Sequence, residues 1–292
     1  MPTTHVATEI ASQPDCWTEA ATLAGTVAHR LPREGERVAV VGCGTSWFVA
    51  MAYAALRERS GHGETDAFAG SEFPTGRRYD RVVAISRSGT TTEVVDLLTA
   101  LDGTPATLLT AVEDSPAADA ADQVVGIPFA DEESVVQTRF ATSALALLRA
   151  HLGEDLAAAT EDCRAALELE VDGLLDVDQC TFLGRGWTVG LASEAALKTR
   201  EAAQFWAEAY PAMDYRHGPV SIAQPGRLVW AFGEVPDGLA DEVGSTGARF
   251  VHHDLDPMAA LVVAQRFAVA LAQRRGLDPD HPRSLTRSVV LG

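Results

Sequence analysis

The sequence predicts an α/β protein made of two successive units, each a parallel β-sheet with helices on both faces. Three observations predict it. Short apolar runs alternate with longer helix-like runs along most of the chain. Glycine turns follow the strand-like runs "RVAVVG" and "QCTFLG", and the order of elements restarts near the middle of the chain. Parallel strands need crossover connections that usually carry helices, so this alternation favours three-layer α/β/α units.

The first half contains four predicted strands, each followed by a predicted helix. The strand-like runs are apolar on both faces, as in buried parallel sheets, and the helix-like runs have apolar residues at helical spacing. The predicted strands span residues 37–42, 81–86, 106–112 and 123–129. The predicted helices span residues 45–59, 90–101, 114–121 and 134–152.

The second half begins with a predicted amphipathic helix and then alternates again. The predicted helices span residues 156–175, 188–210 and 257–276, the last ended by Gly276. The predicted strands span residues 179–186, 227–235 and 248–254.

The two halves share a local pattern. A Gly-Cys-Gly turn at 42–44 corresponds to a Gly-Arg-Gly turn at 184–186, and the helix after each turn contains Ala-Ala-Leu followed by Arg57 or Lys198. Ala-Ala-Leu with a basic residue is common in helices, but the shared strand–glycine–helix context favours a tandem duplication. We expect two domains, at residues 15–155 and 156–292.

Composition narrows the classes of function. The 292 residues carry a formal net charge of -18, so nucleic acid and anionic membrane surfaces are disfavoured as partners. Four cysteines without metal-binding spacing argue against disulfides and zinc, and no metal site is expected at the adjacent His252 and His253. There is no signal-like start and no apolar run long enough to span a membrane, which predicts a cytoplasmic protein.

The stretch "AISRSGTTTEV" places hydroxyl side chains and one glycine at a strand-to-helix turn. One serine or threonine there is usually only a helix cap, but this turn holds more than a cap requires. A helix N-terminus offers free N–H groups and a positive dipole end, and Gly89 allows close approach of a ligand. The turn therefore predicts a phosphate site. The hydroxyl residues are Ser86, Ser88, Thr90, Thr91 and Thr92.

A dinucleotide site is disfavoured at the other glycine turn, "VVGCGTSW". The third glycine of the Rossmann fingerprint, which lets helix and strand pack closely, is replaced here by Trp47. Thr45 and Ser46 at this turn would instead complete a phosphate crevice with the neighbouring hydroxyl turn.

Several segments together resemble the tandem sugar-isomerase (SIS) family. They are "VGCGTSWFVA", "SEFPT", "AISRSGTTTEV", "FLGRGWTVGLASEAALKTREAAQFWAEAYPAMDYRHGPVSI" and "HPRSLTRSVVLG". The similarity is to the isomerase half of glucosamine-6-phosphate synthase, the amino-sugar-phosphate deaminases and the fructosamine-6-phosphate deglycases. It implies two flavodoxin-like SIS units, a sugar-phosphate substrate, no cofactor, and a homodimer, with a tetramer as the alternative.

The resemblance also implies roles for individual residues. Glu201 corresponds to the base that moves a proton between C1 and C2, Lys198 is a pocket lysine, and His217 opens the sugar ring from the neighbouring subunit. The implied phosphate-binding residues are Ser46, Ser86, Arg87, Ser88 and Thr91. The implied sugar-pocket residues are Thr45, Val135, Gln137 and Arg287. From the residues alone, Lys198 and Glu201 share a helix face and could equally be a surface ion pair.

Two departures shape the expected activity. Arg287 stands where the synthase has an imine-forming lysine, and arginine stays protonated, so covalent amino transfer is disfavoured. No glutaminase-like segment precedes the isomerase-like part within this sequence. We therefore expect aldose–ketose isomerisation, or deamination or deglycation of an amino-sugar 6-phosphate. The alternatives are a glutamine–fructose-6-phosphate-transaminase-like isomerase without a glutaminase domain, and a non-catalytic sugar-phosphate sensor.

Overall fold

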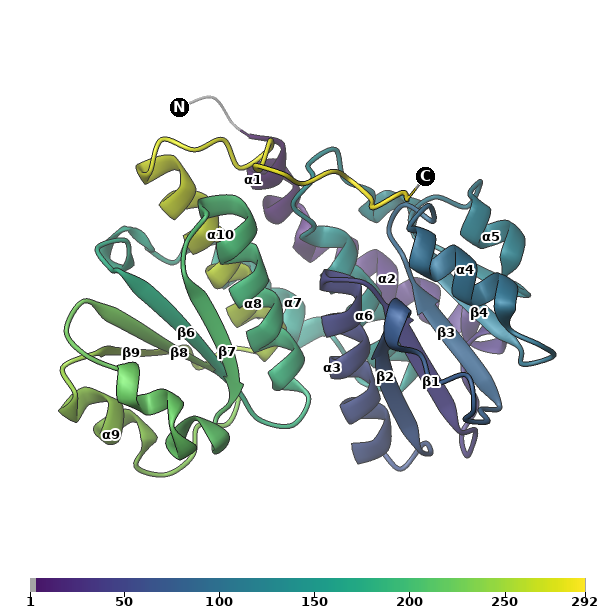
Figure 1. Cartoon of the computed structure of the whole chain (residues 1–292), viewed down its shortest axis with the longest axis horizontal. Helices are drawn as coiled ribbons and strands as arrows, with labels where there is room; N and C mark the ends of the chain where they lie inside the picture. Colours follow the sequence, from purple (N-terminus) through teal and green to yellow (C-terminus); the bar gives the residue numbers. More distant parts are fainter. Residues whose placement is uncertain (1–3, 292) are drawn as a thin grey trace. The chain divides into compact units, whose positions relative to one another are not determined.

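The computed structural model describes residues 4–291 and divides the chain into two compact units (Figure 1). Unit 1 comprises Met1–Pro14, Ser134–Val136 and Ala158–Leu285. Unit 2 comprises Asp15–Glu133, Gln137–Ala157 and Thr286–Gly292. Each unit therefore takes residues from both ends of the sequence.

Unit 2 is built on a five-stranded parallel sheet with the strand order β2-β1-β3-β4-β5. Its central strands are buried on both faces, which explains their continuous apolar sequences. The strands are β1 (Val38–Gly42), β2 (Thr65–Ala69), β3 (Arg81–Ile85), β4 (Ala106–Thr110) and β5 (Gln123–Gly126).

Helices cover both faces of this sheet. On one face, apolar residues of α4 and α5 pack against alternate residues of β1, β3 and β4, including Val41, Val82 and Leu108. Figure 1 shows α2, α3 and α6 on the opposite face, where α3 packs against both β1 and α6. The helices are α2 (Gln13–Val27), α3 (Thr45–Arg59), α4 (Thr92–Ala100), α5 (Pro116–Ala120) and α6 (Arg139–His151).

Unit 1 has a four-stranded parallel sheet with the order β7-β6-β8-β9. Helix α9 packs on one face through Leu239 and Val243, and on the other face Phe267 of α10 meets Trp230 edge to face. The strands are β6 (Gln179–Gly184), β7 (Ala207–Pro211), β8 (Arg227–Phe232) and β9 (Arg249–His252). The helices are α1 (His5–Ala11), α7 (Ala157–Glu168), α8 (Thr188–Ala203), α9 (Leu239–Ser245) and α10 (Pro257–Arg274).

The predicted fold class, parallel sheets in three-layer α/β units, is confirmed. The order β7-β6-β8-β9 also follows the same path as β2-β1-β3-β4, with the second strand of each unit added outside the first. Among the described residues, no helix is both long enough and apolar enough to cross a membrane.

The predicted helix over 188–210 is wrong in its last part. Helix α8 ends at Ala203, and Gln204 adopts the left-handed conformation, with φ 49° and ψ 44°. The chain then forms β7, which pairs with β6. Phe205 and Ala207 are buried while Trp206 between them is 71% exposed, so the side chains alternate with the period of a strand.

The predicted helix over 134–152 begins later than expected. Helix α6 starts at Arg139, because the carboxylate of Glu132 accepts hydrogen bonds from the amides of Thr138, at 2.5 Å, and Arg139, at 2.8 Å. A carboxylate that binds the first free amides stabilises a helix N-terminus at that point. The residues before it, including Ser134, are irregular. Strand β2 was not predicted.

Candidate functional site

The turn after β1 brings the start of α3 very close to the strand. A Cβ added to Gly42 would lie 2.5 Å from the carbonyl carbon of Ser46, so only glycine fits there. Gly44, at the N-cap of α3, has φ 54°, a conformation that also favours glycine. Thr45 and Ser46 are both buried in the first turn of α3. The sequence pattern therefore encodes a tight strand-to-helix turn.

The hydroxyl loop, residues 86–91, follows the neighbouring strand β3. Ser86 Oγ accepts from the Gly89 amide at 3.2 Å, and Ser88 Oγ accepts from the Thr90 amide at 3.2 Å. Gly89 has φ 65°, and a Cβ there would lie 2.0 Å from Ser115 Oγ. Thr91 is the N-cap of α4, but its side chain makes no capping hydrogen bond. The loop is thus rigid and leaves hydroxyl groups for a ligand.

These two turns lie where the strand order of unit 2 reverses. Strands β1 and β3 are adjacent, and the helices that follow them, α3 and α4, lie on opposite faces of the sheet (Figure 1). Open α/β sheets bind ligands in the crevice that forms at such a point, at the carboxyl ends of the strands. The structure therefore brings Ser46, Ser86, Ser88 and Thr91 to one edge of one sheet.

Arg87 belongs to the same loop, but its guanidinium is bound by protein groups. The side chain is buried, and Nη1 lies 3.2 Å from Oε2 of Glu132. Nη2 donates to the carbonyl oxygen of Arg287 at 3.1 Å. Glu132 had not been singled out from the sequence, because it is 45 residues from Arg87 and no local pattern joins them.

The predicted sugar-pocket residues have different surroundings. The guanidinium of Arg287 forms an ion pair with Asp131 and also donates to the carbonyl oxygen of Glu132. Gln137 is half-buried, and its Oε1 is a buried acceptor without a hydrogen-bond partner among the described residues. Val135 lies in the short segment Ser134–Val136, which belongs to unit 1.

In unit 1, helix α8 carries the predicted lysine and carboxylate on one face. Lys198 is buried, forms an ion pair with Glu201, and has Nζ 3.6 Å from Oε1 of Glu194. Glu201 keeps 19% of its side chain exposed, whereas Glu194 is buried. Burial lowers the pKa of the neighbouring Arg200, and the charges of Glu201 and Glu194 oppose this shift. The spacing Glu-xxx-Lys-xx-Glu could have identified Glu194 from the sequence.

His217 ends a short 3-10 helix, η5 (Asp214–His217), that follows β7. It is exposed, and its imidazole makes no hydrogen bond or ion pair within residues 4–291. Tyr215 in the same helix is buried, and burial raises its pKa to about 12. The buried tyrosine anchors the turn and leaves His217 directed away from the core of its own unit.

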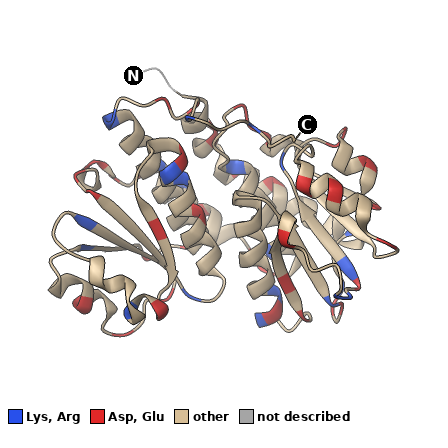
Figure 2. Ribbon diagram, viewed as in Figure 1, with Lys and Arg blue, Asp and Glu red and all other residues tan. Residues whose placement is uncertain are grey.

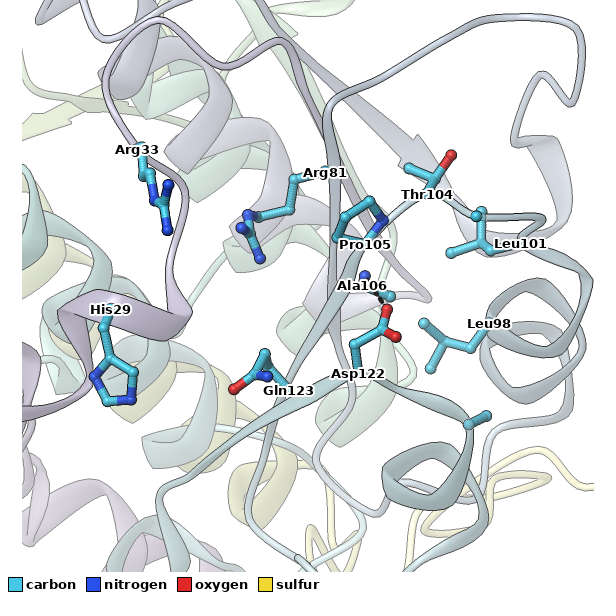
Figure 3. Close-up of a pocket in the computed structure, with 12 residues that line it drawn as sticks. His29, Arg33, Arg81, Leu98, Leu101, Thr104, Pro105, Ala106, Asp122 and Gln123 are labelled. Carbon is cyan, nitrogen blue, oxygen red and sulfur yellow. Dashed lines mark hydrogen bonds between the residues drawn. The ribbon is translucent and has the colours of Figure 1, made fainter.

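The crevice at β1 and β3 differs from a cavity of about 470 Å³ at the opposite end of the same sheet (Figure 3). That cavity has a basic wall, with His29, Arg33 and Arg81, and an apolar wall that includes Leu98 and Leu101. It lies at the amino ends of β3, β4 and β5, where open parallel sheets rarely bind substrates. We therefore place the candidate site at the hydroxyl loop.

Acidic residues outnumber basic residues in this protein, 41 to 23. Figure 2 shows Asp and Glu on elements of both units, with fewer Lys and Arg, in keeping with the net charge of -18. Because the overall field repels anions, an anion bound at the hydroxyl loop must be held by local donors. Serine and threonine hydroxyls and helix N-terminal amides are donors of this kind.

The fold and the paired strand-to-helix turns define a doubly wound α/β protein with a ligand crevice at the strand-order reversal of unit 2. No family model matches the chain. The solved structures that share the fold include the following two. One is the glucosamine-6-phosphate deaminase of Thermotoga maritima, with a TM-score of 0.82, 24% identity and coverage of 99% of this chain and 100% of that one. The other is the tagatose-6-phosphate ketose/aldose isomerase of Escherichia coli, with a TM-score of 0.80, 19% identity and coverage of 96% and 97%.

The sequence is homologous to isomerizing glutamine–fructose-6-phosphate aminotransferases. The protein from Sulfolobus acidocaldarius is 30% identical to it over 298 aligned positions, which cover 87% of this chain and 50% of the relative. The chain thus spans about half the length of the curated relatives it matches.

Proposed function

We propose that the chain is a cofactor-free phosphosugar isomerase-type enzyme. It binds the phosphate of a sugar 6-phosphate at the hydroxyl loop and moves a proton between C1 and C2 of the open-chain sugar. The observation that carries this proposal is the pair of hydroxyl-rich turns at the strand-order reversal of unit 2. The names of the three relatives described above support it, because each name contains a hexose 6-phosphate.

Phosphate would be held by neutral donors. Ser46, Ser86, Ser88 and Thr91 would supply hydroxyl groups. The first amides of α3 would add N–H groups, and the N-termini of α3 and α4 would add the positive ends of two helix dipoles. Thr45, Val135 and Gln137 would line the sugar pocket. The buried, unpartnered Oε1 of Gln137 supports this assignment, because a sugar hydroxyl could donate to it.

Proton transfer would fall to unit 1. Glu201 would act as the base, with Lys198 holding its carboxylate in place and donating a proton or hydrogen bond to the substrate. His217 would open the sugar ring in the active site of a second subunit. Its exposure and its lack of a partner within the described chain support a role across a homodimer interface.

Amino transfer through an imine is the less favoured reaction. Arg287 stands at the position where the resemblance implies a lysine. A guanidinium is a poor nucleophile, and here it pairs with Asp131. Isomerisation, deamination and deglycation do not require an imine between the substrate and a lysine of the protein, so this site could carry out any of the three.

We also propose that the two units are tandem SIS domains in a cytoplasmic protein, with boundaries near 15–155 and 156–292. The shared strand order supports the duplication. An alignment of the two sheets should superpose Gly42 on Gly184 and Arg57 on Lys198.

Proton NMR in D₂O tests the function. Fructose 6-phosphate, glucose 6-phosphate, glucosamine 6-phosphate and galactosamine 6-phosphate would be followed for loss of the C1 or C2 proton. Exchange with interconversion indicates an isomerase, and exchange with release of ammonia indicates a deaminase. No exchange with any of the four, together with binding of at least one, would overturn the enzyme proposal in favour of a sensor.

The Glu201→Gln variant tests the base. It should lose exchange while it still binds the sugar phosphate. The matched control is Glu161→Gln, which makes the same change on the exposed side of α7 and should exchange normally. Near-normal exchange by Glu201→Gln would show that another group is the base.

A further inference from the structure

We propose that Arg87 and Glu132 are positioning residues. Their buried ion pair fastens the C-terminal tail, residues 286–291, to the hydroxyl loop, so that anion binding in the loop and ordering of the tail are coupled. The proposal rests on the proposed function in one respect, since it takes the hydroxyl loop to be the anion site.

The ion pair is enclosed by the protein. The side chain of Arg87 is 3% exposed and that of Glu132 is fully buried. Oε2 of Glu132 faces Arg87 Nη1, and Oε1 accepts from the amide and hydroxyl of Thr138 and from the amide of Arg139. The attraction within a buried ion pair offsets the cost of desolvation only when further hydrogen bonds support its groups, as these bonds do at Glu132. These bonds fix the loop against the start of α6.

The tail is attached to the same pair. Arg87 Nη2 donates to the carbonyl oxygen of Arg287 at 3.1 Å, and the Arg287 guanidinium binds back to Asp131 and to the Glu132 carbonyl. Arg87 therefore contacts both the side chain of Glu132 and the backbone of the tail. The planar guanidinium makes the two contacts from separate nitrogens, Nη1 and Nη2, whereas a lysine would have to make both from one nitrogen.

The tail then runs along the start of α4. The Thr92 amide donates to the carbonyl oxygen of Val289 at 3.1 Å, and the Leu291 amide donates to Thr92 Oγ1 at 2.9 Å. These amides would otherwise be open to solvent or to a ligand at the helix N-terminus. The exchange of these two amide protons with solvent therefore reports whether the tail is bound to the start of α4.

A chain of hydroxyl groups links the loop to the tail. Thr90 Oγ1 lies 2.9 Å from Ser88 Oγ and 2.9 Å from Ser288 Oγ. Each hydroxyl has one proton, so the chain can point either way when the loop is empty. An anion that accepts from Ser88 would make Thr90 donate to Ser88 and Ser288 donate to Thr90. Aligned hydroxyls strengthen one another, so the anion would tighten the tail.

Coupling of this kind is reciprocal. If an anion stabilises the attached tail, then the attached tail raises the affinity for the anion by the same factor. Arg87 would contribute to binding through the tail rather than as a direct ligand, because its charge is already balanced by Glu132.

Amide hydrogen exchange of the C-terminal peptide, with and without inorganic phosphate, tests the proposal. The double variant Arg87→Gln/Glu132→Gln removes the tether together with both charges of the pair, so it should fold. We expect exchange at Leu291 to rise about tenfold or more, as for a locally opened segment. Phosphate should slow exchange in the wild type and not in the double variant.

Two further variants sharpen the result. Arg87→Lys keeps a charge for Glu132 but should lose the contact with Arg287, so it should also free the tail. The matched control is Arg283→Gln, an exposed arginine just before the tail, which should leave exchange unchanged.

Equal tail exchange in the wild type and the double variant would overturn the tether. So would loss of phosphate binding in Arg87→Lys with no change at the tail, since Arg87 would then be a direct ligand. A wild-type protein that binds no phosphate would overturn the proposed function and the coupling, whereas the ligand-free exchange rates would still decide for or against the tether.

Discussion

The carbonyl carbon of Ser46 lies so near Gly42 that a Cβ on the glycine would come within 2.5 Å of it. The contact is between backbone atoms, which cannot move aside as a flexible side chain could. It holds the first turn of α3 against the end of β1, and so it sets the position of the Ser46 hydroxyl. Strand, helix and candidate site are therefore joined at one residue.

Replacing Gly42 with alanine should destabilise the protein by about 1–3 kcal/mol, the usual range for overpacking. Urea unfolding at constant m-value measures this loss. The control is Gly25→Ala in α2, where nothing lies within 4 Å of the added carbon. Alanine is the better helix former, so that variant should gain about 0.5–1 kcal/mol. Equal stability of both variants would contradict the close contact.

Lys198→Met should be strongly destabilising, because it leaves the buried carboxylate of Glu194 and that of Glu201 without their shared cation. Breaking a buried ion pair in this way costs about 3–5 kcal/mol. The double variant Lys198→Met/Glu194→Leu should recover part of the loss, since it removes one of the two charges. Urea unfolding of the single and double variants measures both effects.

The control for Lys198 is Arg164→Met in α7, which removes one member of an exposed ion pair with Glu161. Exposed pairs contribute about 0–1 kcal/mol. If Lys198→Met costs no more than Arg164→Met, then the lysine does not stabilise the carboxylates of α8.

Gln204→Gly should stabilise the protein by about 1 kcal/mol or less, because Gln204 has φ 49° at the end of α8 and glycine adopts this conformation freely. Its side chain is exposed, so little packing is lost. Gln204→Ala is the control, since alanine keeps the Cβ that causes the strain. A gain in thermal stability from alanine equal to that from glycine would rule out the backbone explanation.

Stability should fall as the pH drops below about 6.5, the ordinary pKa of histidine in an unfolded chain. Burial lowers the pKa of His253, which packs beside Trp230, and burial likewise lowers the pKa of His151. Below pH 6.5 the unfolded chain binds protons that the folded protein excludes. The stability from these neutral histidines is thus present above that pH and lost below it.

The urea midpoint at pH 7.5 and at pH 5.5 measures this dependence. His253→Phe removes the buried imidazole and keeps an aromatic ring beside Trp230, so it should lose less stability than the wild type over this range. The control, His29→Phe, changes an exposed histidine and should keep the wild-type dependence. An unchanged slope for His253→Phe would contradict the assignment.

The sequence predicted the parallel-sheet fold because its central strands are buried on both faces and are apolar throughout. It did not predict β2, whose residues Thr65 and Asp66 are polar at an edge of the sheet. The strand β7 was assigned to a helix because Phe205, Ala207 and Tyr210 continued the apolar pattern of α8. There, pairing with β6 decided the structure, and pairing between distant segments leaves little trace in local periodicity.

The candidate site could be predicted where it depends on local geometry. Gly42, Gly89 and the hydroxyl residues occupy turns that their own sequence determines. The binding of Arg87 by Glu132 could not be predicted, because it depends on how three distant segments fold together. The role of Arg87 as a phosphate-binding residue, which the sequence similarity implies, stays a prediction.

The segments of the two units alternate along the amino-acid sequence. A cut near residue 157 would leave unit 1 without the segments Met1–Pro14 and Ser134–Val136, and unit 2 without Thr286–Gly292. Halves expressed from such a cut should therefore fold poorly on their own. The half that contains the hydroxyl loop would also lack the C-terminal tail, which binds Thr92. A split reporter or a domain-exchange chimera based on this protein should therefore join each terminal segment to the unit to which it belongs.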